Sequence, residues 1–156
     1  CLIGSGKLGL AYASFISSKG HSVHCVDKNQ SMIDKFTSGN FDDILEPSVS
    51  EMCKNYPMTY STEIDDSADI KIILVNTPTS YAGYDHTILE DVLKNVKGNV
   101  VITCTVQPGF CDRLNRDIVY NPLFVQIGNI IENLSGTKDV LVGTSDGCEM
   151  YSECLI

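Results

Sequence analysis

The 156-residue sequence predicts an α/β domain built on a doubly wound parallel sheet. Short apolar runs of the kind found in buried parallel strands alternate with segments of helical periodicity. Most of these runs end in short polar or turn-forming segments, and ligands of such sheets bind beyond the carboxyl ends of the strands. The residues that directly follow the strands are therefore the candidate functional residues.

The first dozen residues predict a strand, a tight turn and a helix. An apolar run reaches Gly4, three glycines have G-x-G-x-x-G spacing, and helical periodicity covers residues 7–19. Gly4 would form the turn, Gly6 would let a pyrophosphate approach the backbone, and Gly9 would let the helix pack on the strand. The start of the helix offers N–H groups and a partial positive charge to phosphates. This pattern predicts a Rossmann-type dinucleotide site at Gly4, Ser5, Gly6, Lys7, Leu8 and Gly9.

Asp27 strengthens this prediction. It ends the apolar-alternating strand 22–26 and stands 23 residues after Gly4, near the spacing of about 20 expected for the ribose-binding acid. A carboxylate accepts both ribose hydroxyls and repels a 2′-phosphate, so NAD is favoured over NADP. Lys28, the next residue, weakens that preference.

The remaining elements are predicted from periodicity, caps and breakers. Further helices are predicted from Asn29 or Ser31 to Gly39, from Pro47 through Met52, at 88–96, and from 143–146 to Ile156. Further strands are predicted at 58–60, 70–75, 99–104, 118–120 and 140–142. Their carboxyl ends place Val75 to Thr79, Cys104 to Val106, and Asn121 to Leu123 beside a bound dinucleotide.

Composition excludes several functions. The net charge of −9 and a pI near 4.6, with scattered basic residues, argue against a nucleic-acid partner. No apolar run approaches the roughly 18 to 20 residues of a membrane span, so no membrane partner is expected. No internal repeat or targeting segment is visible.

Seven cysteines without a C-x-x-C pair indicate reduced thiols in a reducing, cytoplasmic compartment. No metal is predicted. His21 and Cys25 would share one strand face while His24 points to the other, and the Asp65, Asp66 and Asp69 cluster is explained by solvent-facing loop ends.

The start of the sequence predicts an incomplete chain. There is no initiator Met, and three residues precede Gly4 where a strand needs about 5 to 6. We therefore interpret residues 1–156 as one domain, a fragment lacking the start of its first strand.

Seven motifs occur in an order that resembles the NAD-binding domain of the UDP-glucose/GDP-mannose dehydrogenase family. They are GSGKLG, GHSVHCVD, ILEP, VNTPT, TVQPG, YNPLFVQIG and VLVGT, and they cover nearly the whole chain. The resemblance implies an oxidoreductase of nucleotide-sugar metabolism and polysaccharide biosynthesis, with UDP-glucose as the default substrate. Its reaction takes the sugar C6 alcohol to the carboxylate of UDP-glucuronate by two hydride transfers to NAD, through a thiohemiacetal and a thioester on a cysteine.

The resemblance also implies roles for single residues. Gly4 through Gly9 and Asp27 would hold the adenosine and the pyrophosphate. Cys104 and Thr105 would approach the nicotinamide, and Thr105 would position a catalytic water. The residues that would line the rest of the cofactor are Val75, Asn76, Thr77, Pro78 and Thr79.

Three positions depart from the family pattern. Leu123 stands where the family has a glutamate for acid–base chemistry, and loss of such a group typically costs about 10²–10⁴ in rate. Ile127 stands where a second glutamate often occurs near cofactor and substrate, and Met32 replaces an arginine-like phosphate contact.

The resemblance implies that a central helix and a UDP-sugar-binding domain lie beyond Ile156. They would supply the nucleophilic cysteine, a lysine, most nucleotide-sugar contacts and the surface for a homo-oligomer. We expect residues 1–156 alone to be inactive, and we interpret Cys104 as a packing variant of the family's serine.

Three alternatives stay open at this point. The first is a degenerate, non-catalytic NAD-binding module. The second is a different Rossmann dehydrogenase, such as one acting on β-hydroxy acids. The third is a doubly wound domain that binds no dinucleotide. The ILEP and NPLF segments weigh against the second.

Overall fold

The computed structural model describes residues 1–41, 46–81 and 83–144. They form two compact units. Of the described residues, unit 1 comprises those in 1–65 and 124–137, and unit 2 comprises those in 66–123 and 138–144.

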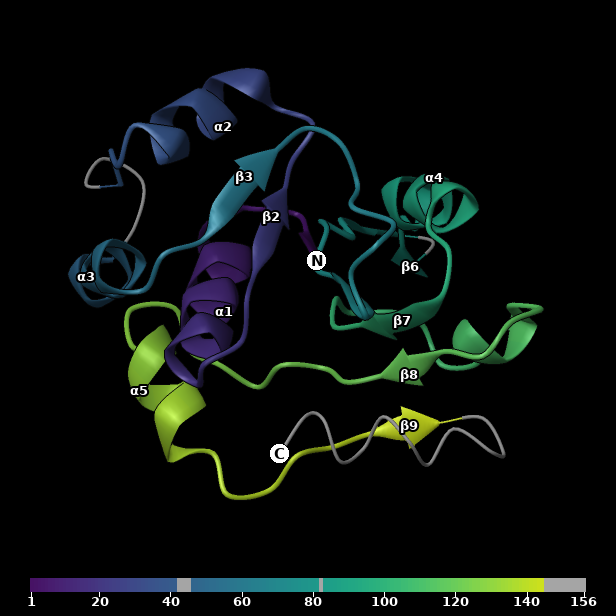
Figure 1. Cartoon of the computed structure of the whole chain (residues 1–156). Helices are drawn as coiled ribbons and strands as arrows, with labels where there is room; N and C mark the ends of the chain where they lie inside the picture. The colour runs from purple at the N-terminus through teal and green to yellow at the C-terminus, as the bar shows by residue number, and fades with distance from the viewer. Residues whose placement is uncertain (42–45, 82, 145–156) are drawn as a thin grey trace. The chain divides into compact units, whose positions relative to one another are not determined.

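Unit 1 is a parallel three-stranded sheet with four helices (Figure 1). The strand order is β3-β2-β1, and Leu2 pairs with Cys25 while His24 pairs with Thr59. The strands are β1 (Leu2–Ile3), β2 (His24–Val26) and β3 (Thr59–Ser61). The helices are α1 (Lys7–Ser18), α2 (Gln30–Thr37), α3 (Pro47–Asn55) and α5 (Ile130–Gly136).

Helix α1 is the centre of unit 1, because α3 and α5 both pack against it. Its buried stripe includes Leu10, Ala11 and Ala13. On α2, Phe36 is fully buried and stacks on Phe41 with ring centroids 5.7 Å apart. The core of unit 1 is therefore built around α1 and the aromatic pair Phe36 and Phe41.

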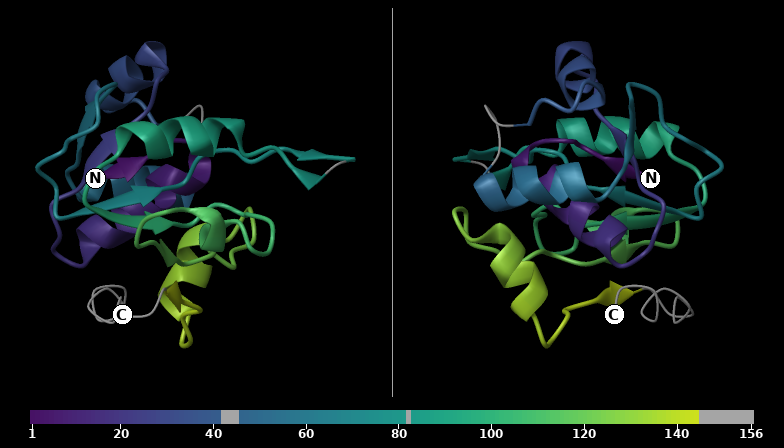
Figure 2. Two further views of the ribbon diagram at one scale, coloured as in Figure 1. Left: turned by 90° about the vertical axis from the view of Figure 1, so that its right-hand side faces the viewer. Right: turned by 60° about the vertical axis from the view of Figure 1, so that its left-hand side comes forward.

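Unit 2 contains a sheet of order β4-β7-β8-β9, whose first three strands are parallel. The strands are β4 (Ile70–Ile73), β7 (Asn99–Ile102), β8 (Val119–Tyr120) and β9 (Gly143–Thr144). A separate antiparallel hairpin consists of β5 (Thr79–Ser80) and β6 (Gly83–Tyr84), and it extends away from α4 (Thr87–Asn95) as a narrow arm (Figure 2). A 3₁₀ helix covers Cys111–Arg113.

Two basic side chains donate hydrogen bonds to the main chain of the loops before β4 and β7. Buried Lys71 donates from Nζ to the carbonyls of Asp66 at 2.8 Å and Ala68 at 2.6 Å. Arg116 donates to the carbonyls of Val96 at 2.8 Å and Gly98 at 3.0 Å. The Arg116 bonds satisfy carbonyls just beyond the end of α4, and the Lys71 bonds satisfy carbonyls of the loop before β4.

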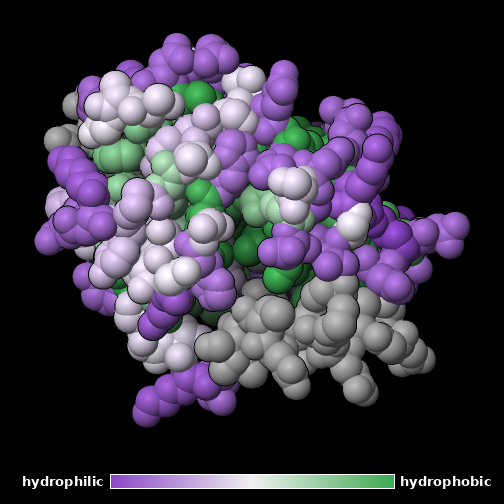
Figure 3. Space-filling model, viewed as in Figure 1, coloured by the Kyte–Doolittle hydropathy of each residue, from purple (hydrophilic) through white to green (hydrophobic). Residues whose placement is uncertain are grey.

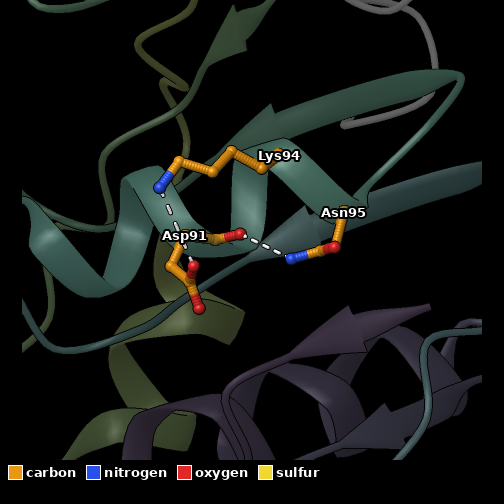
Figure 4. A network of polar contacts seen from close by, with 3 residues as sticks. All are labelled: Asp91, Lys94 and Asn95. Atoms are coloured by element: carbon orange, nitrogen blue, oxygen red, sulfur yellow. Dashed lines mark hydrogen bonds and ion pairs between the residues drawn. The ribbon is translucent and has the colours of Figure 1, made fainter.

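The outer side of α4 is polar. Hydrophilic residues surround α4 on the face shown in Figure 3. On α4, Lys94 Nζ lies 3.8 Å from Asp91 Oδ1, and Asn95 donates to the Asp91 carbonyl at 2.9 Å (Figure 4). An ion pair this exposed contributes little to stability. This face of α4 carries no feature of a site.

The α/β fold class is confirmed, with parallel strands alternating with helices inside both units. The predicted strand at 140–142 is wrong. Asn121 Nδ2 donates to the Leu141 carbonyl at 3.0 Å, and the strand begins at Gly143, antiparallel to β8. Helix α5 and the β5–β6 hairpin were not expected. The final helix predicted to reach Ile156 lies outside the described residues.

Across the residues that the structure describes, no helix is long and apolar enough to cross a membrane.

Candidate functional site

The glycine turn after β1 has the geometry that its spacing predicts. Gly4 adopts φ +104°, and its N–H donates to the Val26 carbonyl at 2.8 Å, which ties the end of β1 to the end of β2. A Cβ on Gly9 would lie 1.9 Å from the Gly4 carbonyl oxygen, so α1 begins in direct contact with the strand end. A side chain at position 9 is therefore excluded.

Gly6 differs from Gly9 in what surrounds it. It is the N-cap of α1 with an ordinary φ of −69°, it is exposed, and a Cβ there would meet no atom within 4 Å. Glycine is thus not required there by the fold. An open backbone at the start of a helix is what a phosphate needs for close approach.

Asp27 is fixed by main-chain donors on both sides. The Ser5 N–H donates to Oδ2 at 3.0 Å, and the Asn29 N–H donates to Oδ1 at 3.0 Å. Each carboxylate oxygen keeps a lone pair for a further donor such as a hydroxyl. The structure therefore brings residues 4–9 and Asp27 together as one group, which we call the glycine cluster.

The other members of the glycine cluster differ in exposure. The Ser5 side chain is fully buried and donates to the Val26 carbonyl at 3.1 Å, so it serves the fold and leaves only its backbone toward the turn. Lys7 is exposed and Leu8 is half-buried. Lys7 can thus place a positive charge beside an anion at the helix start.

In unit 2, the loops after β4 and β7 are joined by side-chain hydrogen bonds. Thr77 Oγ1 donates to the Thr105 carbonyl at 2.8 Å, and Thr103 Oγ1 donates to the Ile73 carbonyl at 2.9 Å. We call Thr77, Cys104 and Thr105 the threonine cluster. The other residues expected beside the cofactor lie along the first of these two loops: Val75 is half-buried, while Asn76, Pro78 and Thr79 are exposed.

Cys104 is a buried packing residue in this structure. Its side chain is 7% exposed, and burial raises the pKa of its thiol to about 11. A thiolate is the nucleophilic form, so this environment disfavours reaction. Thr105, the next residue, is exposed and able to contact a ligand.

Two contacts from the hairpin side support the Thr105 loop, and sequence reasoning missed both. The buried His86 ring lies 4.3 Å from the Phe110 ring, and its Nε2 accepts from the Gln107 N–H at 3.4 Å. A Cβ on Gly83, where φ is +110°, would lie 1.8 Å from Gln107 Nε2. The polar loop that holds both residues gave no signal beyond its turn-forming composition.

Leu123 follows β8 and is half-buried, so the place expected for a glutamate holds an apolar side chain. Buried Asn121 fixes this strand end because its N–H donates to the Ile102 carbonyl at 2.9 Å. Ile127 belongs to unit 1, where 81% of its side chain is exposed. Met32 is a half-buried residue of α2.

The histidine of β2 is engaged in hydrogen bonds along the neighbouring strand. His24 Nδ1 lies 2.7 Å from Thr59 Oγ1, and its Nε2 lies 2.9 Å from Ser61 Oγ. Within the described ranges, no group of three or more His, Cys, Asp or Glu could hold a metal ion. Both ring nitrogens of His24 are thus engaged with side chains of β3, which explains this histidine as a structural residue.

The NAD binding domain model of the UDP-glucose/GDP-mannose dehydrogenase family matches residues 1–153. UDP-glucose 6-dehydrogenase of Gallus gallus is 27% identical over 181 residues, covering 96% of this chain and 36% of that protein. The chain thus spans little more than a third of the length of the curated relatives it matches.

Solved structures share the fold over almost the entire chain. A GDP-mannose dehydrogenase from Pseudomonas aeruginosa matches with a TM-score of 0.86 at 21% identity, covering 99% of this chain and 42% of that one. A UDP-N-acetyl-mannosamine dehydrogenase from Staphylococcus aureus matches with a TM-score of 0.85 at 24% identity, covering 99% and 43%.

Proposed function

The chain belongs to the UDP-glucose/GDP-mannose dehydrogenase family, and on that premise we propose that it is the NAD-binding part of a nucleotide-sugar 6-dehydrogenase. The family consists of NAD-dependent oxidoreductases, so NAD is the cofactor. This membership argues against a dehydrogenase of another family and against a domain that binds no dinucleotide.

We propose that the glycine cluster binds the adenosine and pyrophosphate of NAD. The observation that carries this proposal is the fixed carboxylate of Asp27 beside the open backbone of Gly6. The half-buried carboxylate would accept the ribose hydroxyls, and the first turn of α1, with exposed Lys7, would face the phosphates.

We propose that the threonine cluster and the loop from Val75 to Thr79 serve the nicotinamide end. When bound, NAD would accept the hydrides that leave the sugar C6. Thr105 would position a water near the reacting carbon, with its main chain held by Thr77. The buried, protonated thiol of Cys104 would pack against the cofactor and take no part in covalent chemistry.

UDP-glucose is the substrate that we propose, with oxidation to UDP-glucuronate and two NADH formed per sugar. Support comes from the curated UDP-glucose 6-dehydrogenases that resemble this chain, while the solved neighbours include enzymes named for GDP-mannose and UDP-N-acetyl-mannosamine. The nucleophilic cysteine, most sugar contacts and an oligomer interface would lie in further parts of the protein. The cytoplasm is the compartment we propose, since none of the five cysteines within the described residues forms a disulfide.

The test is to assay the full-length protein that contains this chain with NAD and a panel of UDP- and GDP-sugars, following the absorbance of NADH. Two NADH per UDP-glucose would support the proposal. Two NADH formed per molecule of another nucleotide sugar would support the proposed reaction and identify that sugar as the substrate in place of UDP-glucose. NAD binding without reduction on any sugar would support the second candidate, a non-catalytic NAD-binding module, which Leu123 and Ile127 favour.

The same assay tests the loss of the family's glutamate. We expect Leu123→Glu in the full-length protein to raise turnover by about 10²-fold if proton transfer limits the rate, since a positioned acid or base contributes roughly 10²–10⁴-fold. Unchanged turnover would mean that another group already performs this step. Leu123→Gln is the matched comparison, because its side chain has the size of glutamate but carries no titratable group.

A further inference from the structure

Glu46 belongs to the ILEP motif, and the proposed reaction gives it no role. It is the N-cap of α3, yet its side chain makes no capping hydrogen bond there. Instead its carboxylate reaches a distant segment of unit 1, where Oε1 accepts from the Gly128 N–H at 2.5 Å and Oε2 from the Ile130 N–H at 3.4 Å. A charged acceptor holds main-chain donors more strongly than a neutral one.

The segment held by Glu46 is a tight turn. The Asn129 N–H donates to the Gln126 carbonyl at 3.1 Å, and the Gln126 N–H donates to Asn133 Oδ1 at 2.7 Å. Gly128 has φ +100°, a conformation that other residues rarely adopt. Side-chain acceptors therefore hold the backbone on both sides of Ile127.

This turn continues the segment that leaves the carboxyl end of β8. Residues 121–127 follow that strand end, and ligands of parallel α/β sheets bind beyond such ends. Within the segment, 74% of the Phe124 side chain and 81% of the Ile127 side chain are exposed. The turn thus holds two large apolar side chains where they can contact a ligand.

We infer that Glu46 is a positioning residue that fixes the turn 126–129 and so holds Phe124 and Ile127 against the nucleotide sugar. This inference rests on the proposed function for the identity of the ligand. It assigns Glu46 an effect on sugar binding, whereas NAD affinity depends on the glycine cluster.

The first test measures amide hydrogen exchange in the full-length protein. In Glu46→Ala we expect the amides of Gly128 and Ile130 to exchange at least about tenfold faster, because both lose their acceptor. Glu46→Gln keeps one acceptor oxygen and should show an intermediate rate. Glu51→Gln, an exposed position on the same helix, is the control and should leave both rates unchanged. Unchanged exchange in Glu46→Ala would overturn the inference.

The second test uses the full-length protein. We expect Glu46→Ala to raise KM for the sugar about tenfold, with the Kd for NAD unchanged, and Glu46→Gln to restore part of the loss. Faster exchange with unchanged sugar binding would overturn the inference, as would equal losses of NAD and sugar affinity, which indicate a general structural defect. If no sugar is oxidised, the proposed function fails, and calorimetric binding of UDP-glucose to the wild type and Glu46→Ala then decides the role of Glu46.

Discussion

The glycine cluster and the threonine cluster are built in different ways. In unit 1, the turn depends on a missing Cβ at Gly9 and on main-chain donors that hold Asp27. In unit 2, the loop that carries Thr105 depends on side chains more than twenty positions away, Thr77 and His86. The comparison teaches that a backbone-built site leaves its spacing in the sequence, whereas a site supported by side chains does not.

The largest expected effect is that of Gly9→Ala. The new Cβ would lie 1.9 Å from a backbone oxygen that cannot move away, so the free energy of unfolding should fall by more than ~3 kcal/mol. Urea denaturation followed by circular dichroism measures this. The control is Gly6→Ala, where the Cβ meets open space, the cost should stay below ~1 kcal/mol, and NAD affinity should fall. Equal stability of the two variants would contradict the conclusion that the fold requires glycine at position 9 but not at position 6.

Gly83→Ala tests the support of the threonine cluster. Its φ of +110° is strained for alanine, and the Cβ would displace the Gln107 side chain, so we expect a loss of about 1–2 kcal/mol in the free energy of unfolding. The Gln107 side chain is flexible and can move, so the loss should be smaller than at Gly9. The same denaturation series measures it. A loss larger than that of Gly9→Ala would reverse the ranking of the two clusters.

Asp27→Ala should leave the fold intact and weaken NAD binding roughly tenfold, or ~1.4 kcal/mol, because the ribose hydroxyls lose their acceptor. Titration calorimetry with NAD and NADP measures the change. The ratio of the affinity for NAD to that for NADP should be smaller in the variant than in the wild type. An unchanged affinity for NAD would refute the ribose assignment.

The smallest effect concerns the Cys104 thiol. Its pKa of about 11 leaves about one thiolate in a thousand at pH 8, so alkylation should be slow and accelerate about tenfold per pH unit. An unfolded cysteine loses its proton near pH 8.5, so the folded state binds more protons between about pH 9 and 11 and is destabilised as the pH rises there. The thermal midpoint should therefore fall between pH 8 and pH 10, and it should fall less in Cys104→Ala than in the wild type. Fast alkylation of Cys104 at pH 7 would contradict the conclusion that its thiol is buried and protonated.

The sequence predicted most of unit 1 because its signals are local. Asn29 caps α2, Pro47 opens α3, and Gly9 lets α1 pack against the end of β1 because it has no side chain. It did not predict α5, whose buried Ile130 and Leu134 supply one turn of apolar spacing in seven residues. Nor could it predict the bond between His86 and Gln107, since a histidine between a loop and a helix has no spacing that indicates its partner.

The order in which unit 1 is assembled has a consequence for synthesis. Helix α1 ends at Ser18, and its neighbour α5 begins at Ile130, 112 positions later in the chain. At roughly 5–20 residues per second, a ribosome needs about 6–22 s to make the intervening chain. During that time the part of α1 that packs against α5 has no partner, so a nascent chain that stops before α5 would expose an apolar surface that chaperones bind.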